Sequence, residues 1–195
     1  MTFLSWFLFG YSLLERSIEI IVSRRNQRAM RSRGFVESES PLGMSGMILM
    51  HVGWFVSLII EADFFSAATG TPLRITAATI FVATQGLRGW TLATLGKFWN
   101  VSVYTNGGVE GSFVANGPYR FIRHPNYLVV ILELLTLPIA GGAPVTAVVF
   151  TAVNGLLLWR RIRLEEQGLF AVPGYREVMG HKPRFLPSVK RSVIA

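Results

Sequence analysis

The chain has 195 residues, which is enough for one domain of ordinary size. Apolar residues make up 51% of it and charged residues only 15%, whereas an average soluble domain has roughly 25% charged residues. This composition is typical of a membrane protein. The absence of cysteine excludes disulfide bonds, thiolate metal sites and cysteine nucleophiles.

Five apolar runs approach the length needed to cross about 30 Å of hydrocarbon. They cover residues 3–22, 43–62, 73–95, 126–140 and 143–160. The first run does not have the pattern of a cleavable signal peptide, because Glu15, Arg16 and Glu19 interrupt its end. The last two runs are separated only by the turn-forming stretch from Ala140 to Pro144, which predicts a tight helical hairpin. We therefore expect an all-α integral membrane protein with about five transmembrane helices.

The basic residues are distributed unevenly among the connections. Sixteen of the 19 Lys and Arg residues fall between runs one and two, between runs three and four, or from Arg160 onward. The connections at about 63–72 and 140–144 contain none. The positive-inside rule places the basic connections in the cytoplasm and the N-terminus outside. The net charge of +8 then follows from membrane topology, and nucleic-acid binding is not expected, because there is no basic stripe with interleaved aromatic residues.

The connection at about 96–125 is long for a compact chain, and such loops are usually functional or disordered. Its many aromatic and branched residues argue against disorder. It ends at a Pro125 that fits the first turn of a helix, which places His124 near the N-cap. Free backbone N–H groups and the helix dipole favour an anionic group there. A capping and membrane-interface motif, with Arg123 among lipid headgroups and Tyr127 in an aromatic belt, explains the same residues equally well.

A second group of charges stands where the fifth run ends. If the helix continues, Arg161 and Glu165 lie four residues apart on one face, and Arg163 and Glu166 lie three apart on another. On a solvated helix such pairs contribute only about 0.3–0.5 kcal/mol each. Their position at the membrane edge, close to the His124 loop, predicts instead a cleft that contains charges of both signs.

Glu133 lies inside the fourth apolar run. An ionisable side chain at this depth costs on the order of 2–3 kcal/mol, so it is either functional or a hydrogen-bonded packing residue. Other charged residues of the first three helices either pair within the bundle or line an entrance; they are Glu15, Arg16, Glu19, Glu61 and Arg88. The three histidines lack the spacing of metal ligands, so no metal site is predicted.

Taken together, these residues resemble the isoprenylcysteine carboxyl methyltransferase family of integral membrane enzymes. The resemblance covers about residues 90–187 and is carried by Leu95-Gly96-Lys97-Phe98-Trp99, Gly117-Pro118-Tyr119-Arg120, Arg123-His124-Pro125-Asn126-Tyr127, and Arg161-Ile162 with Glu165-Glu166-Gln167-Gly168-Leu169. The N-terminal half looks like the small bacterial members associated with type III polyketide synthases, which O-methylate alkylpyrones. The resemblance implies that residues 1–95 form three transmembrane helices. It also implies that residues 96–195 form a catalytic region of loop, hairpin and tail, within one structural unit.

The resemblance implies an enzyme that uses S-adenosylmethionine (SAM) to methylate an acidic oxygen, a carboxylate or an enol, of a lipophilic substrate. The acceptor would be an alkylpyrone polyketide or an isoprenylcysteine-like carboxylate, met at the cytoplasmic face of a bacterial inner membrane. Catalytic roles are implied for Arg161, which would face the acceptor, and for Glu165 and Glu166. Contacts to the cofactor are implied for Tyr104, Gly111, Ser112, Phe113, Val114, Tyr119, His124, Pro125, Asn126, Tyr127 and Glu165.

One position departs from the family pattern, which often has two tyrosines four residues apart after the paired glutamates. Here Tyr175 is followed by Met179, so we assign Tyr175 no role. Two other interpretations remain open. An NADPH-dependent membrane reductase of the sterol type is similar around the His-Pro motif, although 195 residues leave little room for its larger bundle. A non-enzymatic membrane adaptor would use the charged loops to dock a partner.

Overall fold

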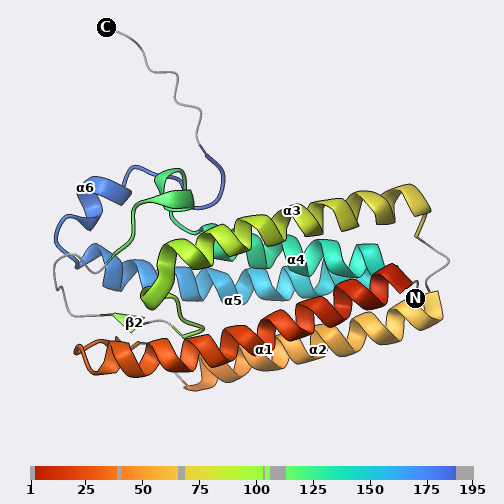
Figure 1. The fold of residues 1–195 in the computed structure, drawn as a ribbon, viewed down its shortest axis with the longest axis horizontal. Coiled ribbons are helices and arrows are strands. Elements are labelled where there is room, and N and C mark those ends of the chain that lie inside the picture. The colour runs from red at the N-terminus through yellow and green to blue at the C-terminus, as the bar shows by residue number, and fades with distance from the viewer. Residues whose placement is uncertain (1–2, 39–40, 66–68, 103, 106–112, 188–195) are drawn as a thin grey trace, which may run out of the picture.

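The computed structural model describes residues 3–38, 41–65, 69–102, 104–105 and 113–187, and its long helices run side by side (Figure 1). The α-helices are α1 (Phe3–Arg31), α2 (Pro41–Phe65), α3 (Thr71–Leu95), α4 (Pro125–Gly141), α5 (Pro144–Phe170) and α6 (Tyr175–Met179). Two short 3₁₀ helices are η2 (Gly96–Phe98) and η3 (Gly117–Arg120). The two-residue strands β1 (Val36–Glu37) and β2 (Tyr104–Thr105) pair antiparallel. The predicted helical fold is confirmed, with this small strand pair as an addition.

Helix α1 continues well beyond the apolar run that predicts it. The run ends near residue 22, whereas the helix ends at Arg31. Its extension is rich in Arg, Gln, Ala and Met, which are good helix formers. The helix stops before Gly34, whose φ of 83° is one that glycine adopts easily, and the Phe35 N–H donates to the Met30 carbonyl at 3.2 Å. The arginine-rich connection is therefore largely helical.

The predicted hairpin between the last two long helices is present. Helix α4 is capped by Gly142, which has a left-handed φ of 89°. The Ala143 N–H donates to the Pro138 carbonyl at 2.7 Å, and α5 begins directly afterwards at Pro144. A left-handed glycine followed by a proline at the first helical position is the sequence pattern of a helix stop and a helix start.

Two of the described helices are long and apolar enough to cross a membrane, within Gly43–Phe64 and Pro144–Phe170. Helix α4 is apolar but has only 17 residues, and the charges within α1 and α3 lower their hydropathy. Large apolar side chains are exposed on several helices, as expected for contact with lipid; examples are Phe7, Leu14, Leu49, Phe64 and Leu156. The membrane character is thus supported, and the number of five crossings stays a prediction.

Helix α5 is longer than a bilayer requires. Its 27 residues span about 40 Å at 1.5 Å per residue, compared with about 30 Å of hydrocarbon. Its polar part begins at Arg160. The last turns of α5 therefore extend beyond the apolar layer and can take part in a site in water.

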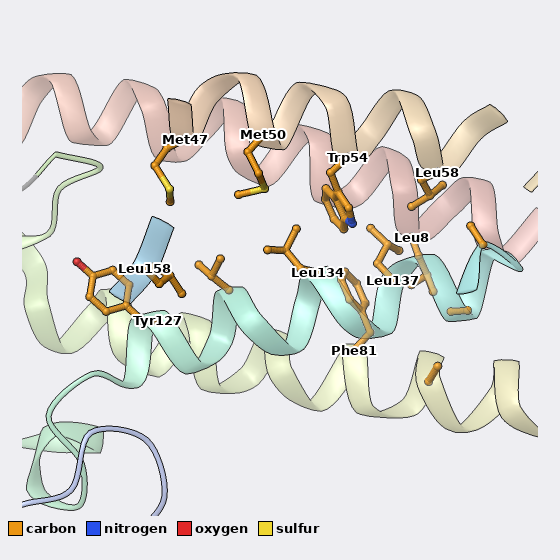
Figure 2. Packing of buried hydrophobic residues seen from close by; sticks show 14 of the residues in the cluster. Leu8, Met47, Met50, Trp54, Leu58, Phe81, Tyr127, Leu134, Leu137 and Leu158 are labelled. Carbon is orange, nitrogen blue, oxygen red and sulfur yellow. The ribbon is translucent and has the colours of Figure 1, made fainter. Parts of the chain in front are cut away.

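The apolar core lies where α4 is enclosed by the other long helices (Figure 2). Trp54 and Leu58 of α2, Phe81 of α3 and Leu134 and Leu137 of α4 are at most 1% exposed. Figure 2 shows Trp54 and Leu58 pointing from α2 toward α4, and Phe81 pointing toward α4 from α3. Because α4 is apolar on all sides and buried on most of them, it is the central helix of the bundle.

A network of charges crosses this core. Arg88 is 1% exposed and bonds to the carboxylates of Glu19 and Glu133. Arg16 also contacts both carboxylates, with 2.8 Å between its Nη1 and Glu19 Oε2. Gln85 Nε2 donates to Glu133 Oε1 at 2.9 Å. Both carboxylate oxygens of Glu133 are paired, so it is a hydrogen-bonded packing residue that joins α1, α3 and α4.

The connections predicted to be cytoplasmic gather at one end of the bundle. Figure 1 shows α6, β2 and the C-terminal end of α1 at this end, whereas the N-terminus and the turn between α4 and α5 lie at the other. Strand pairing sets Val36 opposite Thr105 and thereby ties the end of α1 to the long connection. The long connection, the tail and the polar end of α5 are thus brought into reach of one another.

Candidate functional site

A pocket lies at this end of the bundle, between the end of α1, η2, the segment 113–127, the polar end of α5, and α6. Eight of the predicted site residues line it: Phe113, Val114, Tyr119, His124, Asn126, Tyr127, Arg161 and Glu165. Residues more than 40 positions apart in the sequence therefore meet in one cavity.

The other predicted site residues are placed differently. Pro125 begins α4 and Glu166 lies on α5, and neither is among the residues that line the pocket. The backbone of Tyr104 belongs to β2, and its side chain lies outside the described part of the structure. Gly111 and Ser112 lie outside the described residues.

Gly117 allows the segment 113–122 to pack closely on α3. Its φ is 53°, and a Cβ atom at this position would lie 2.4 Å from the Thr94 hydroxyl oxygen. Any other residue would therefore clash with α3 as well as strain the backbone. The helix η3 that begins here buries Tyr119, which is 9% exposed, in the pocket wall.

His124 is the N-cap of α4, as predicted, and it is 3% exposed. Its ring stacks on Tyr127 at 5.3 Å between centroids, and its Nε2 lies 3.0 Å from Glu166 Oε1. Arg184 Nη2 donates to the other Glu166 oxygen at 2.6 Å, and Arg123 Nη1 lies 3.2 Å from Oε1. Burial alone would raise the pKa of Glu166, but the hydrogen bonds from His124 and Arg184 lower this pKa to about 2. Glu166 is therefore an ionised anchor for the residues around it.

The C-terminal tail adds backbone bonds to the same segment. The Arg123 N–H donates to the Pro183 carbonyl at 2.9 Å, and the His124 N–H donates to the Arg184 carbonyl at 3.0 Å. Lys182 Nζ donates to the carbonyl of Tyr119 at 2.9 Å. The tail thus fixes the turn that carries His124, a role that the spacing of the sequence did not indicate.

Arg161 and Glu165 share one face of α5, as their spacing predicts, and this face lines the pocket. Glu165 accepts a hydrogen bond from the Tyr127 hydroxyl, and its side chain remains 31% exposed. Arg161 is 8% exposed, and its guanidinium donates to the Val101 carbonyl and lies 5.9 Å from the centre of the Tyr127 ring. A cation and an anion therefore stand one helical turn apart in the same cavity. The two adjacent glutamates differ in their contacts: Glu165 lines the pocket, and Glu166 pairs with His124, Arg184 and Arg123.

Aromatic rings close the pocket on the side of α6. Tyr175 is 2% exposed and packs edge-to-face against Phe113 at 5.2 Å and against Phe170 at 5.4 Å. Tyr175 and Met179 both line the cavity. The sequence pattern gives Tyr175 no role, whereas in the structure this residue forms part of the pocket wall.

The opposite wall comes from the N-terminal part of the chain. Met30 and Phe35, from the end of α1 and the residues after it, line the pocket together with Trp99, Asn100 and Ser102. The contribution of α1 could not be predicted from the sequence, because contacts between residues about 70 positions apart leave no periodic signal. The only signal was the stretch from Leu95 to Trp99, which forms part of the family resemblance.

The chain is similar to several known proteins. The model of the isoprenylcysteine carboxyl methyltransferase (ICMT) family matches residues 76–171. YpbQ, an uncharacterized protein of Bacillus subtilis, is 35% identical over 167 residues, which are 84% of this chain and 95% of YpbQ. An uncharacterized protein of Haemophilus influenzae is 26% identical over 83% of this chain and 92% of its own length. The cobalt-zinc-cadmium resistance protein CzcN of Cupriavidus metallidurans is 35% identical over 53% of this chain and 48% of CzcN.

A solved structure is also similar. It is that of a eukaryotic intramembrane Ras methyltransferase, isoprenylcysteine carboxyl methyltransferase, with a TM-score of 0.56 and 23% sequence identity. The match covers 67% of this chain and 47% of that protein. At this identity the likeness shows a shared fold.

Proposed function

Because the chain belongs to the isoprenylcysteine carboxyl methyltransferase family, we propose that it uses SAM to methylate an acidic oxygen of a lipophilic acceptor at the cytoplasmic face of the membrane. One observation carries this proposal. The pocket is lined at once by the segment that contains His124, by Arg161 and Glu165 of α5, and by aromatic residues of both walls. It lies at the end where the predicted cytoplasmic connections meet.

The residues of the pocket fit SAM chemically. SAM has an aromatic base, a carboxylate and two positive groups, and the pocket contains groups complementary to each kind. Phe113 and Tyr119 provide aromatic surface, and Glu165 provides a carboxylate. The Arg123 guanidinium lines the cavity, and its buried Nε has no hydrogen-bond partner among the described residues. We therefore assign the cofactor to the side of the pocket formed by segment 113–127 and α6.

When bound, SAM supplies a methyl group whose carbon–sulfur bond breaks as the acceptor's oxygen anion forms the new carbon–oxygen bond. A carboxylate or acidic enol is already ionised near neutral pH, so the protein needs no strong base. The protein needs to hold the acceptor oxygen in line with the carbon–sulfur bond that breaks, since orientation accounts for much of the rate. Arg161 is assigned this task through charge-assisted hydrogen bonds, and its bond to the Val101 carbonyl restricts its orientation.

The first test concerns Arg161. Arg161→Ala should lower methyl transfer from labelled SAM into host lipid extract at least about a hundredfold, because the acceptor oxygen loses its cation, while the Kd of SAM measured by calorimetry stays within about twofold. Arg163→Ala is the matched control, since Arg163 is exposed on the same helix and lies over the Trp159 ring at 4.0 Å. Normal turnover by the Arg161 variant would contradict its role.

The second test concerns His124. His124→Ala removes the Nε2 contact to Glu166 and the stack on Tyr127 and should raise the Kd of SAM about tenfold or more. His181→Ala, at an exposed position of the C-terminal tail, is the matched control and should leave this Kd unchanged. If both His124→Ala and Arg161→Ala methylate lipid normally, the proposed site is wrong.

The acceptor is identified by what becomes labelled. Methyl-labelled SAM is incubated with the purified protein and host lipid extract, and the labelled lipid is analysed by mass spectrometry. A pyrone enol ether indicates an alkylpyrone, and a methyl ester indicates an isoprenylcysteine-like carboxylate. Tight binding of NADPH without binding of SAM would favour a reductase, and binding of neither would favour an adaptor.

A further inference from the structure

The α1 side of the pocket contains a buried hydrogen-bond donor that has no partner in the described part of the chain. Trp99 is 5% exposed and lines the pocket, and no described residue accepts a hydrogen bond from its indole N–H. Buried N–H groups are nearly always paired, and leaving one unpaired is unfavourable. A polar atom of a bound molecule would satisfy this N–H.

The backbone of Trp99 is held in place by α1. Asn26 Nδ2 donates to the Gly96 carbonyl at 3.1 Å and to the Trp99 carbonyl at 2.8 Å. The Trp99 N–H donates back to Gly96 at 3.2 Å, which closes the turn. Asn26 therefore fixes both ends of η2, and a donor fixed in this way loses little freedom when a ligand binds.

Hydrogen bonds connect the segment after Trp99 to Arg161, the residue assigned to the acceptor. Ser23 of α1 accepts a hydrogen bond from the Val101 N–H at 3.0 Å, and the Val101 carbonyl accepts one from Arg161. Trp99 and Arg161 thus both line the pocket and are connected through one peptide segment that α1 holds. A cation and a neutral N–H donor that line the same pocket form a suitable donor set for an anionic oxygen.

We propose that Trp99 is a second acceptor-binding residue, whose indole N–H donates to the oxyanion of the lipophilic acceptor beside Arg161. Asn26 and Ser23 are positioning residues for this wall. The inference rests on the proposed methyl transfer and adds where the acceptor lies: on the α1 side of the pocket, opposite the side assigned to SAM. The family match begins at residue 76, so the helix that positions this wall lies outside the matched region. Acceptor selection is therefore set in part by α1.

The deciding variant is Trp99→Phe, which keeps an aromatic ring and removes the N–H. The wild-type reaction identifies which lipid of the host extract becomes labelled. The unmethylated form of this lipid, purified from extract that has not reacted, is the acceptor in the assay. We expect its KM to rise at least about tenfold, as for loss of a hydrogen bond to a charged oxygen, while the Kd of SAM stays within about twofold. Trp90→Phe is the matched control: Trp90 on α3 is 49% exposed and does not line the pocket, so both constants should stay at wild-type values.

The role of Asn26 is tested by combining variants. Like Trp99→Phe, Asn26→Leu should raise the KM of the acceptor and leave the Kd of SAM unchanged. Added to Trp99→Phe it should cause little further loss, because both changes act on the same hydrogen bond. Fully additive losses would show that Asn26 does not act through Trp99 and would overturn its positioning role.

Failure of this inference is distinguishable from failure of the proposed function. If the wild type labels no lipid, the methyl-transfer proposal fails, and this inference fails with it. If the wild type methylates lipid and Trp99→Phe has a wild-type acceptor KM, only the role of Trp99 is wrong. Should Trp99→Phe not fold, site-specific replacement of Trp99 by benzothienylalanine, which has the shape of tryptophan without the N–H, gives the same comparison. A wild-type KM for that protein overturns the inference.

Discussion

At the scale of single residues, Glu61 of α2 shows how a side chain can accept hydrogen bonds from the free backbone N–H groups of another helix. Its two carboxylate oxygens accept the Val145 N–H at 2.8 Å and the Thr146 N–H at 2.6 Å, at the first turn of α5. These are N–H groups that a helix cannot satisfy internally, and a carboxylate also interacts favourably with the positive end of the helix dipole. Glu61 therefore caps α5 from another helix.

Glu61→Ala should destabilise the protein by about 1–2 kcal/mol, as loss of a helix cap does, and lower its Tm in detergent by a few degrees. Glu61→Gln should retain part of this stability, because its amide oxygen still accepts one N–H. Glu177→Ala, at an exposed position of α6, is the control and should leave the Tm unchanged. Equal Tm values for Glu61→Ala and the wild type would exclude the capping role.

From the sequence, Glu61 is expected only to pair within the bundle or to line an entrance. Its partners are 84 and 85 positions away, and they are backbone groups that any residue type could supply. The contrast with Arg161 and Glu165 is informative. Their common face follows from the local repeat of one helix, so their meeting in the pocket was predictable.

At the scale of elements, the buried charges bind α1, α3 and α4 together. Arg88 contacts Glu19 and Glu133, and its Nε lies 3.6 Å from Glu15. Breaking a buried ion pair from one side is strongly destabilising, because it leaves an uncompensated charge. Arg88→Met should therefore destabilise the protein by about 3–5 kcal/mol in thermal unfolding in detergent.

Removing a carboxylate together with its cation should restore part of the stability that Arg88→Met loses. The double variant Arg88→Met with Glu133→Leu leaves fewer unpaired charges and should unfold at a higher temperature than Arg88→Met alone. Arg24→Met, at an exposed position of α1, is the control for loss of one positive charge. A double variant that is less stable than Arg88→Met would show that the network does not act as a unit.

The long helices were predictable because apolar runs and punctuating Gly and Pro residues are local signals. Helix α5 begins at Pro144 and the hairpin turns at Gly142, as their residue types indicate. The extension of α1 to Arg31 could not be predicted in the same way, since the apolar run ends where the arginines begin. That extension carries Met30 to the pocket and Asn26 to the backbone of Gly96 and Trp99, so this wall of the pocket could not be predicted without those helical turns.

At the scale of the whole molecule, the pocket takes residues from both predicted parts of the chain. Met30 and Phe35 belong to the part before residue 96, and Glu165 and Tyr175 belong to the part after it. The strand pair and the bonds from α1 to residues 96–102 connect the two parts. A truncated chain that begins at residue 96 would lack one wall of the pocket, so we expect residues 1–95 and 96–195 to act as one unit.

The predicted five-crossing topology is tested at this scale by labelling. Because the chain contains no cysteine, a single introduced thiol reports its own side of the membrane without background. Thr71→Cys, at the exposed start of α3, should react with a membrane-impermeant maleimide in intact cells. Ser32→Cys, exposed just after α1, should react only after the membrane is permeabilised. Labelling of Ser32→Cys in intact cells would place the basic connections, and with them the pocket, on the outer side, where a methyl donor from the cytosol would not reach Arg161.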